Sequence, residues 1–265
     1  MEVEPRGNPR AASLLLLVAN LLPLAAIPLR GWRAYEVLFV YWIEIGLCIA
    51  LYYALALFAQ RDPESDRTGR LHPDPASFPR RSGSVKPLER LPPIRYRNVR
   101  YVPEALVMAL GFWFFCGALF VDVPNPELSS ASQGPLREYL AVIAAAATVE
   151  GLALAVLLFG VRLVIVGHGF FGQRQYERFS PSILADIPLR IVFFWFLLLV
   201  VLQVALVVRS LFAGALDPTA TQRLAIAVVV ASKLAIDRSL VQARYRTERG
   251  RFSRWLVPDE STADR

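Results

Sequence analysis

The sequence has few of the residues that build metal sites and disulfides. It contains two cysteines and two histidines among 265 residues. His72 and His168 lie far from each other and from Cys48 and Cys116, so the spacing fits no zinc motif. Both cysteines lie inside apolar runs, where a single thiol ordinarily behaves as a small hydrophobic group. No motif in the sequence implies a metal or a cofactor.

Motifs of the common membrane-embedded and nucleotide-dependent enzymes are also missing. The sequence has no H-E-x-x-H of metalloproteases, no G-x-S-x-G of serine hydrolases and no Walker motif. A pair of aspartates within apolar runs is missing as well, since only Asp237 lies deep in one. Enzyme activity therefore stays possible but has no support in the sequence.

Charged residues are scarce, and the apolar residues that dominate the chain are unevenly distributed. The charged residues make up 19% of the chain, against 55% hydrophobic residues, and the mean hydropathy is +0.42. The apolar residues form long uninterrupted runs, which are typical of membrane-spanning helices. We predict an all-α, multi-pass integral membrane bundle of about six helices in the plasma membrane. The runs are 12–29, 35–59, 101–121, 139–166, 187–208 and 220–240, and the sixth is the weakest because its apolar part is short.

The first run has a cleaved signal peptide as its alternative interpretation, because Arg6 and Arg10 precede it. However, no clear small-x-small cleavage site follows, and Pro23 interrupts the run. We therefore expect an uncleaved first helix.

The distribution of Lys and Arg predicts the orientation. With both termini cytoplasmic, 23 of these residues lie on the cytoplasmic side and five outside. This asymmetry follows the positive-inside rule. It gives four parts: two helices in 1–59, a basic and mostly disordered cytoplasmic linker in 60–100, four helices in 101–241, and a basic cytoplasmic tail in 242–265.

The tail interleaves arginines with Tyr245, Phe252 and Trp255. Grooves for nucleic acid use such a mixture, and so do segments that lie on anionic headgroups. Because the tail directly follows a predicted span, we expect the bilayer and anionic lipid headgroups as partners, and no nucleic acid. A homo- or hetero-oligomer is a further possibility that the sequence leaves open.

Ionisable residues lie deep in three of the predicted spans. At 1.5 Å per residue, Glu44 is about 15 Å, Glu150 about 18 Å and Lys233 about 20 Å from the outer end of its span. Asp237 follows Lys233 by four residues and so shares its helix face. Each residue would cost about 2.5–3.5 kcal/mol if it faced lipid. We therefore expect the four side chains to meet inside the bundle.

In this prediction Lys233 is the only basic group deep in the membrane. Three acids against one lysine leave an excess of negative charge, which predicts protonated carboxyls, a cation or water in the cluster. Tyr41, three residues before Glu44, is expected to donate a hydrogen bond to its carboxylate. Two interpretations stay open: an ion-pair cluster that holds helices together, or a proton, ion or ligand site.

A resemblance can be stated on these residues. The stretch N-L-L-P in the first run, Y-W-I-E in the second and S-K-L-A-I-D in the last resemble a family of uncharacterised multi-pass membrane proteins from archaea and bacteria, a domain of unknown function. The resemblance implies an architecture and no activity. The sequence departs from that family in having no histidine in 238–242, which weakens a metal-site interpretation. The matching residues are Asn20, Pro23, Tyr41, Trp42, Glu44, Lys233 and Asp237.

Three functions follow, in decreasing order of support. The first is a non-catalytic membrane protein that binds a ligand, lipid or partner subunit. The second is a proton- or ion-coupled transporter that uses Glu44, Glu150 and Lys233, although the two halves of the chain show no convincing internal repeat. The third is a membrane-embedded enzyme, for which no catalytic residue can be named.

Overall fold

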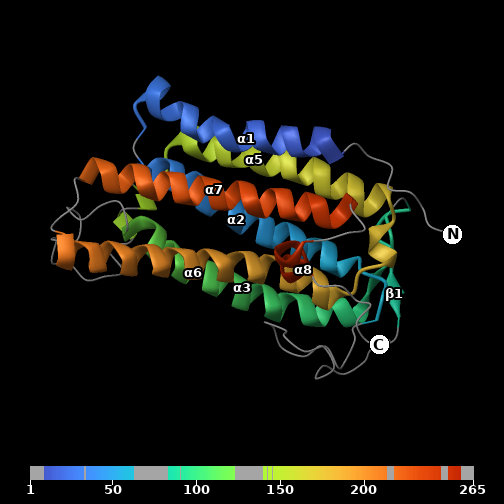
Figure 1. Cartoon of the computed structure of the whole chain (residues 1–265). Helices are drawn as coiled ribbons and strands as arrows, with labels where there is room; N and C mark the ends of the chain where they lie inside the picture. The colour runs from blue at the N-terminus through green and yellow to red at the C-terminus, as the bar shows by residue number, and fades with distance from the viewer. Residues whose placement is uncertain are drawn as a thin grey trace.

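Long helices make up most of the described chain, as Figure 1 shows for a computed structural model. The structure describes residues 9–32, 34–62, 83–89, 91–122, 140–141, 143–144, 146–213, 218–245 and 250–257. The α-helices in this part are α1 (Pro9–Arg30), α2 (Ala34–Leu57), α3 (Tyr96–Asp122), α5 (Val149–Gly167), α6 (Pro181–Ala213), α7 (Pro218–Tyr245) and α8 (Arg251–Leu256). The other elements are strands β1 (Ser84–Val85) and β2 (Ile94–Arg95), the π-helix η3 (His168–Gly172) and the 3-10 helix η4 (Gln175–Glu177).

Successive long helices run in opposite directions along one bundle axis (Figure 1). The start of α1, the end of α7, strand β1 and helix α8 lie at the same end of the bundle, called the α8 end below. The α2, α5 and α7 helices all begin at the opposite end. The prediction of an all-α bundle agrees with this arrangement.

Among the described residues, five helical segments are long and apolar enough to cross a membrane. The segments are Ala11–Arg30, Glu36–Leu57, Tyr96–Gly117, Val149–Gly172 and Pro181–Ala205. These correspond to the first five predicted runs. Helix α7 is 28 residues long but does not meet the same measure of hydropathy and charge, so a sixth span remains a prediction.

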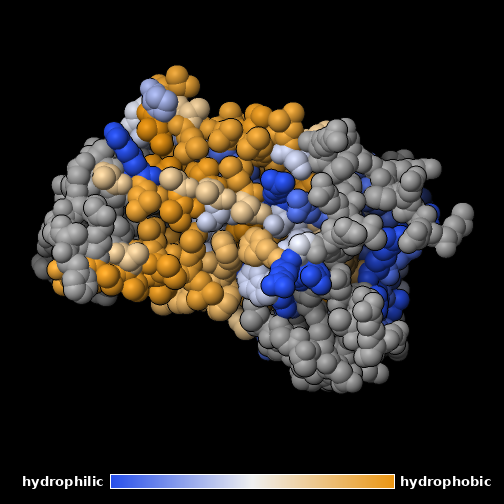
Figure 2. Space-filling view, in the orientation of Figure 1, coloured by the Kyte–Doolittle hydropathy of each residue, from blue (hydrophilic) through white to orange (hydrophobic). Residues whose placement is uncertain are grey.

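The bundle exposes apolar side chains over much of its length. Figure 2 shows a wide hydrophobic band along the helices, with hydrophilic side chains gathered mainly towards the α8 end. Large hydrophobic residues on several helices stay exposed, among them Leu15 at 46%, Val107 at 71% and Val201 at 64%. A water-soluble bundle would bury such residues, whereas lipid solvates them.

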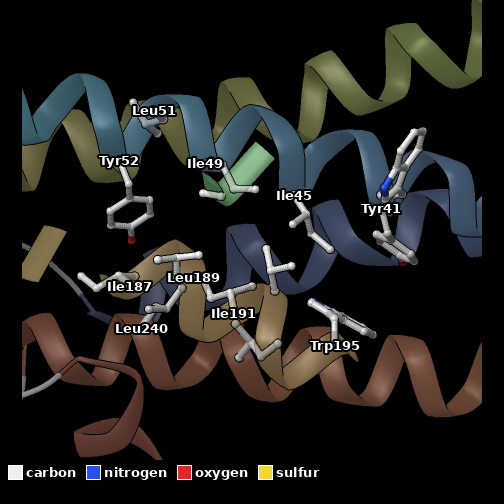
Figure 3. Packing of buried hydrophobic residues seen from close by; sticks show 14 of the residues in the cluster. Tyr41, Ile45, Ile49, Leu51, Tyr52, Ile187, Leu189, Ile191, Trp195 and Leu240 are labelled. Atoms are coloured by element: carbon white, nitrogen blue, oxygen red, sulfur yellow. The ribbon is translucent and has the colours of Figure 1, made fainter. Parts of the chain in front are cut away.

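Helix α2 forms the centre of the bundle. Apart from Glu44 and Glu36 its sequence is apolar on nearly all faces, which is expected of a helix surrounded by others, and it packs against α1, α3, α5, α6 and α7. Figure 3 shows Ile45 and Ile49 pointing from α2 towards Ile191 and Trp195 of α6. All four of these side chains are buried.

A tryptophan pair joins α2 to α3. Trp42 and Trp113 stack with ring centroids 4.4 Å apart. Each indole also donates to the other residue's backbone carbonyl, Trp113 Nε1 to Trp42 O at 2.8 Å and Trp42 Nε1 to Trp113 O at 3.3 Å. Gly46 makes the close approach possible, because a Cβ there would lie 2.6 Å from the Trp113 ring. Trp42 therefore contributes to the packing of α2 on α3.

The fourth predicted run is broken rather than continuous. Residues 147 and 148 are not helical, and α5 begins only at Val149. Thr148 caps this helix, because its Oγ1 accepts a hydrogen bond from the Gly151 backbone N–H at 3.0 Å. The run of 139–166 therefore does not give one helix, and residues of α5 lie closer to the opposite end of the bundle than a helix from 139 would place them.

The two borders of the predicted linker are tied to the bundle. Within 60–100, residues 63–82 and 90 lie outside the described part of the chain. β1 and β2 pair antiparallel, and α3 already begins at Tyr96. The Asn98 amide donates to the carbonyls of Ala56, Leu57 and Ala59 at 2.9–3.1 Å. The last carbonyls of a helix have no N–H four residues further on to accept from, so Asn98 acts as a cap of α2 from another helix.

Part of the predicted tail also packs on the protein. Helix α8 places Phe252 against Phe194 of α6, with ring centroids 5.4 Å apart. Arg190 Nη1 donates to the Trp255 carbonyl at 2.6 Å, and Ser253 Oγ donates to the Ser239 carbonyl at 3.0 Å. The Arg190 guanidinium also lies over the Trp255 ring, 5.8 Å from its centroid, so both aromatic side chains of α8 contact the bundle, while Arg251 and Arg254 remain exposed.

Gly46 offers a test of the α2–α3 packing. We expect Gly46→Ala to lower the free energy of unfolding in detergent by about 1–3 kcal/mol, because the added methyl group collides with Trp113. Gly160→Ala in α5 is the matched control, since nothing lies within 4 Å of a Cβ added there. The control should be neutral or stabilising by about 0.5–1 kcal/mol. Equal melting midpoints for the two variants would contradict the packing.

Candidate functional site

Four charged side chains from three helices form a closed ring in the middle of the bundle. Arg162 Nε of α5 donates to Glu44 Oε1 of α2 at 2.7 Å, and Arg162 Nη2 pairs with Asp237 Oδ1 of α7. Lys233 Nζ lies 2.9 Å from Asp237 Oδ2 and 3.0 Å from Glu44 Oε2. Each charge therefore touches two charges of opposite sign. We call these four residues the charge ring.

The charge ring is almost completely shielded from solvent. Glu44, Lys233 and Asp237 are each 2% exposed and Arg162 is 5% exposed. A single charge in such a place would be very costly, whereas alternating charges with several hydrogen bonds offset much of that cost. The ring holds two acids and two bases, so its formal charge is zero.

Neighbouring polar groups complete the ring. Asn20 Nδ2 of α1 donates to Asp237 Oδ2 at 2.7 Å and to the Leu16 carbonyl at 2.8 Å. Cys48 Sγ donates to Glu44 Oε1 at 3.3 Å. The ring and Asn20 together therefore connect α1, α2, α5 and α7.

Tyr41 is buried beside the ring but has a different partner from the one expected. Its hydroxyl donates to the Asn20 backbone carbonyl at 2.6 Å rather than to the Glu44 carboxylate. This bond ties α2 to α1, one turn before Pro23, which is buried inside α1. Tyr41 thus supports the ring indirectly, through the helix that carries Asn20.

Glu150 does not join the cluster, contrary to the sequence-based expectation. It lies in the first turn of α5 and pairs with Arg30 at 3.4 Å, where both side chains are more than half exposed. A negative charge at this position is favourable because it faces the positive end of the helix dipole. The late start of α5 at Val149 explains the difference, since it places Glu150 at the end of the bundle and not at mid-depth.

Arg162 is one of the 23 basic residues that the charge distribution predicted on the cytoplasmic side, but the structure places it in the charge ring. With α5 starting at Val149, Arg162 lies thirteen residues into the helix, about 20 Å deep. Apolar residues on both sides, in F-G-V-R-L-V-I-V, are the signal that could have revealed it. Lys233 is therefore not the only deep base. The expected excess of acid, with protonated carboxyls or a cation to balance it, is replaced by equal numbers of acids and bases.

A small cavity of about 10 Å³ adjoins the charge ring, which is room for about one water molecule. All four ring residues line it, and apolar side chains of α2, α6 and α7 complete the wall. The structure has no group of three or more His, Cys, Asp and Glu residues able to hold a metal ion within its described residues.

A glycine motif at the end of α5 resembles a nucleotide-binding loop in its spacing but belongs to a helix. The segment from Gly167 to Gly172 reads G-H-G-F-F-G, the glycine spacing of a dinucleotide-binding loop. In that fold the motif follows a strand, whereas here it continues α5 and forms the π-helix η3. The spacing therefore gives no support for nucleotide binding.

Comparison with known proteins identifies a family and nothing more specific. A model described as a family of unknown function, DUF6498, matches residues 2–252. No curated protein and no solved structure matches the chain. The expectation of membership in a family of unknown function is confirmed.

A double-mutant cycle tests the charge ring. Glu44→Gln and Lys233→Met should each lower the melting midpoint in detergent, because each leaves the ring with a net charge. The double variant should recover part of the loss, with a coupling energy of about 0.5–3 kcal/mol. Arg30→Gln and Glu150→Gln form the control cycle, whose coupling should be about 0–1 kcal/mol because that pair is exposed. Additive losses for Glu44 and Lys233 would contradict the pairing.

Proposed function

We propose that this chain, which belongs to the DUF6498 family of unknown function, is a non-catalytic plasma-membrane protein that binds anionic lipid headgroups at its cytoplasmic end. The proposal includes six membrane spans, with α7 as the sixth. Lys233 and Asp237 reduce the hydropathy of α7, but both are buried in the charge ring and need not face lipid. The alternating directions of the long helices in Figure 1 support this count.

The observation that favours binding over catalysis is the saturation of the charge ring. Each of its carboxylates contacts both Arg162 and Lys233, so neither is free to act as a nucleophile or base on a substrate. The adjoining cavity of about 10 Å³ has no room for a substrate larger than water. These features support a ring that specifies how the helices pack.

The α8 end carries the charge expected for a cytoplasmic membrane surface. Because Arg162 lies inside the bundle, the number of basic residues predicted on this side falls from 23 to 22, against five on the other side. Exposed basic residues of several elements gather there, and anionic headgroups attract such residues by about 1 kcal/mol each. The described ones are Arg61, Lys86, Arg100, Arg174, Arg178, Arg238, Arg251 and Arg254.

Cysteine labelling tests the orientation. In a variant whose native Cys48 and Cys116 are replaced by alanine, we expect Ala147→Cys to react with a membrane-impermeant maleimide in intact cells. Ser84→Cys in β1 should react only after permeabilisation. Both positions are exposed, so access to the reagent and not burial decides the result. The reverse pattern would overturn the assignment of the α8 end to the cytoplasm.

Lipid-dependent stability tests the headgroup proposal. Phosphatidylglycerol added to the detergent-solubilised protein should raise its melting midpoint more than phosphatidylcholine does. Replacing Arg251 and Arg254 by glutamine should remove about 2 kcal/mol of this selective effect, at about 1 kcal/mol per arginine. Arg223→Gln, exposed near the start of α7, is the control and should keep the full effect. Equal responses of all variants would contradict lipid binding through α8.

A proton-coupled transporter is the second candidate. It is favoured by one observation: carboxylates from two helices, Glu44 and Asp237, meet at a cavity in the middle of the bundle. Glu150 has no part in this version, because it lies at the exposed Arg30 pair. Proton flux into vesicles that is present with the parent protein and lost with Glu44→Gln would favour transport over the non-catalytic role.

A further inference from the structure

Three small cavities lie in series between the charge ring and the α8 end. The first adjoins the ring and measures about 10 Å³. The second, also about 10 Å³, is lined by Arg162 and Asp237 on one side and by Tyr52 and Val166 on the other. The third, about 20 Å³, shares Tyr52 and Val166 with the second and is also lined by Gln175.

Shared lining residues show that the cavities are neighbours. Arg162 and Asp237 belong to the first and second cavity, and Tyr52 and Val166 to the second and third. Tyr52 lies eight residues after Glu44 in α2, about 12 Å nearer to the α8 end. Figure 3 shows its hydroxyl pointing from α2 into the space beside Ile187 and Leu240.

Each cavity has about the volume of one water molecule and at least two polar residues in its lining. A water molecule needs about 10–15 Å³ and at least two polar partners. The first cavity offers the four ring residues, the second offers Arg162, Asp237 and Tyr52, and the third offers Tyr52 and Gln175. Dry cavities in proteins are lined by apolar groups alone.

Asn20 lines none of the three cavities, but its buried side-chain oxygen beside the ring also needs a polar partner. It is 2% exposed, and its side-chain oxygen has no hydrogen-bond partner among the described protein groups. Its amide nitrogen bonds to Leu16 and Asp237, and both of those residues line the second cavity. A buried amide oxygen of this kind is ordinarily satisfied by an ordered water.

We propose that the three cavities form a water-filled path by which water and protons pass between the α8 end and the charge ring. The path runs between α2, α5, α6 and α7, with Tyr52 as its polar midpoint. The path begins at the α8 end. The assignment of that end to the cytoplasm is the one part of this inference that rests on the proposed function. The path supplies water to Cys48 and to both carboxylates of the ring without any opening of the bundle.

The two native cysteines provide the probe and its control. Cys48 is 4% exposed and lines the first cavity, whereas Cys116 is 2% exposed and lines none of the three. When the protein is transferred to D₂O, a thiol reached by water exchanges its proton for a deuteron, and its infrared S–H band is replaced by an S–D band. Variants Cys116→Ala and Cys48→Ala each leave one thiol, so each rate is measured alone in reconstituted vesicles.

The path predicts that Cys48 exchanges at least about tenfold faster than Cys116, because a thiol in a dry core must wait for local opening. Ala243→Leu, which fills the third cavity, and Tyr52→Phe, which removes only the hydroxyl at the midpoint, should both slow the exchange of Cys48. Ala153→Leu on the exposed side of α5 is the control and should leave the rate unchanged.

Two results would overturn the path. One is a Cys48 rate equal to that of Cys116. The other is fast Cys48 exchange that neither Ala243→Leu nor Tyr52→Phe slows, which would place the water route elsewhere. If Ala243→Leu fails to fold, the nearly isosteric Tyr52→Phe decides alone. The exchange depends on neither orientation nor lipid headgroups, so its outcome is separate from the tests of the proposed function.

Discussion

The interaction on which the rest of the structure depends is the ring of Glu44, Arg162, Asp237 and Lys233. Once one of these charges is placed in an apolar bundle, the other three must follow, because an unpaired charge there costs far more than any single packing contact contributes. The ring fixes the rotation of α2, α5 and α7 about their own axes, and Asn20 extends this constraint to α1. In the proposed membrane location, where polar contacts contribute little stability on average, the ring chiefly specifies which helix faces meet.

Helix α2 can occupy the centre because it has no polar face apart from the one that contributes to the ring. Its remaining contacts use close packing. Gly46 admits the Trp113 ring, and the paired tryptophans satisfy their own indole N–H groups on each other's backbone. In the proposed membrane location lipid is as apolar as a side chain, so close packing at small residues and satisfied donors hold the helices together.

The α8 end is held by hydrogen bonds across elements rather than by a separate domain. Asn98 caps α2 from the neighbouring helix α3, and Arg190 of α6 bonds to the Trp255 carbonyl of α8. Both arrangements satisfy polar groups where the apolar interior ends. They also place the exposed arginines of α8 at the surface where the proposed headgroup contact would form.

The apolar runs of the sequence by themselves determined the helical bundle, the first five long helices and the meeting of Glu44 with Lys233 and Asp237. Such runs have few alternatives to helices, and counting residues from the start of a helix gives depth when that start is known.

The fourth run shows where this reasoning stops, because a threonine cap inside an apolar stretch carries little weight in a hydropathy pattern. Only the tertiary structure decided that α5 begins at Val149, and this start moves Glu150 to the exposed end and Arg162 into the ring. A shift of ten residues in one helix start changes the depth of every side chain after it by about 15 Å, and that shift turned an expected excess of acid into a ring of balanced charge.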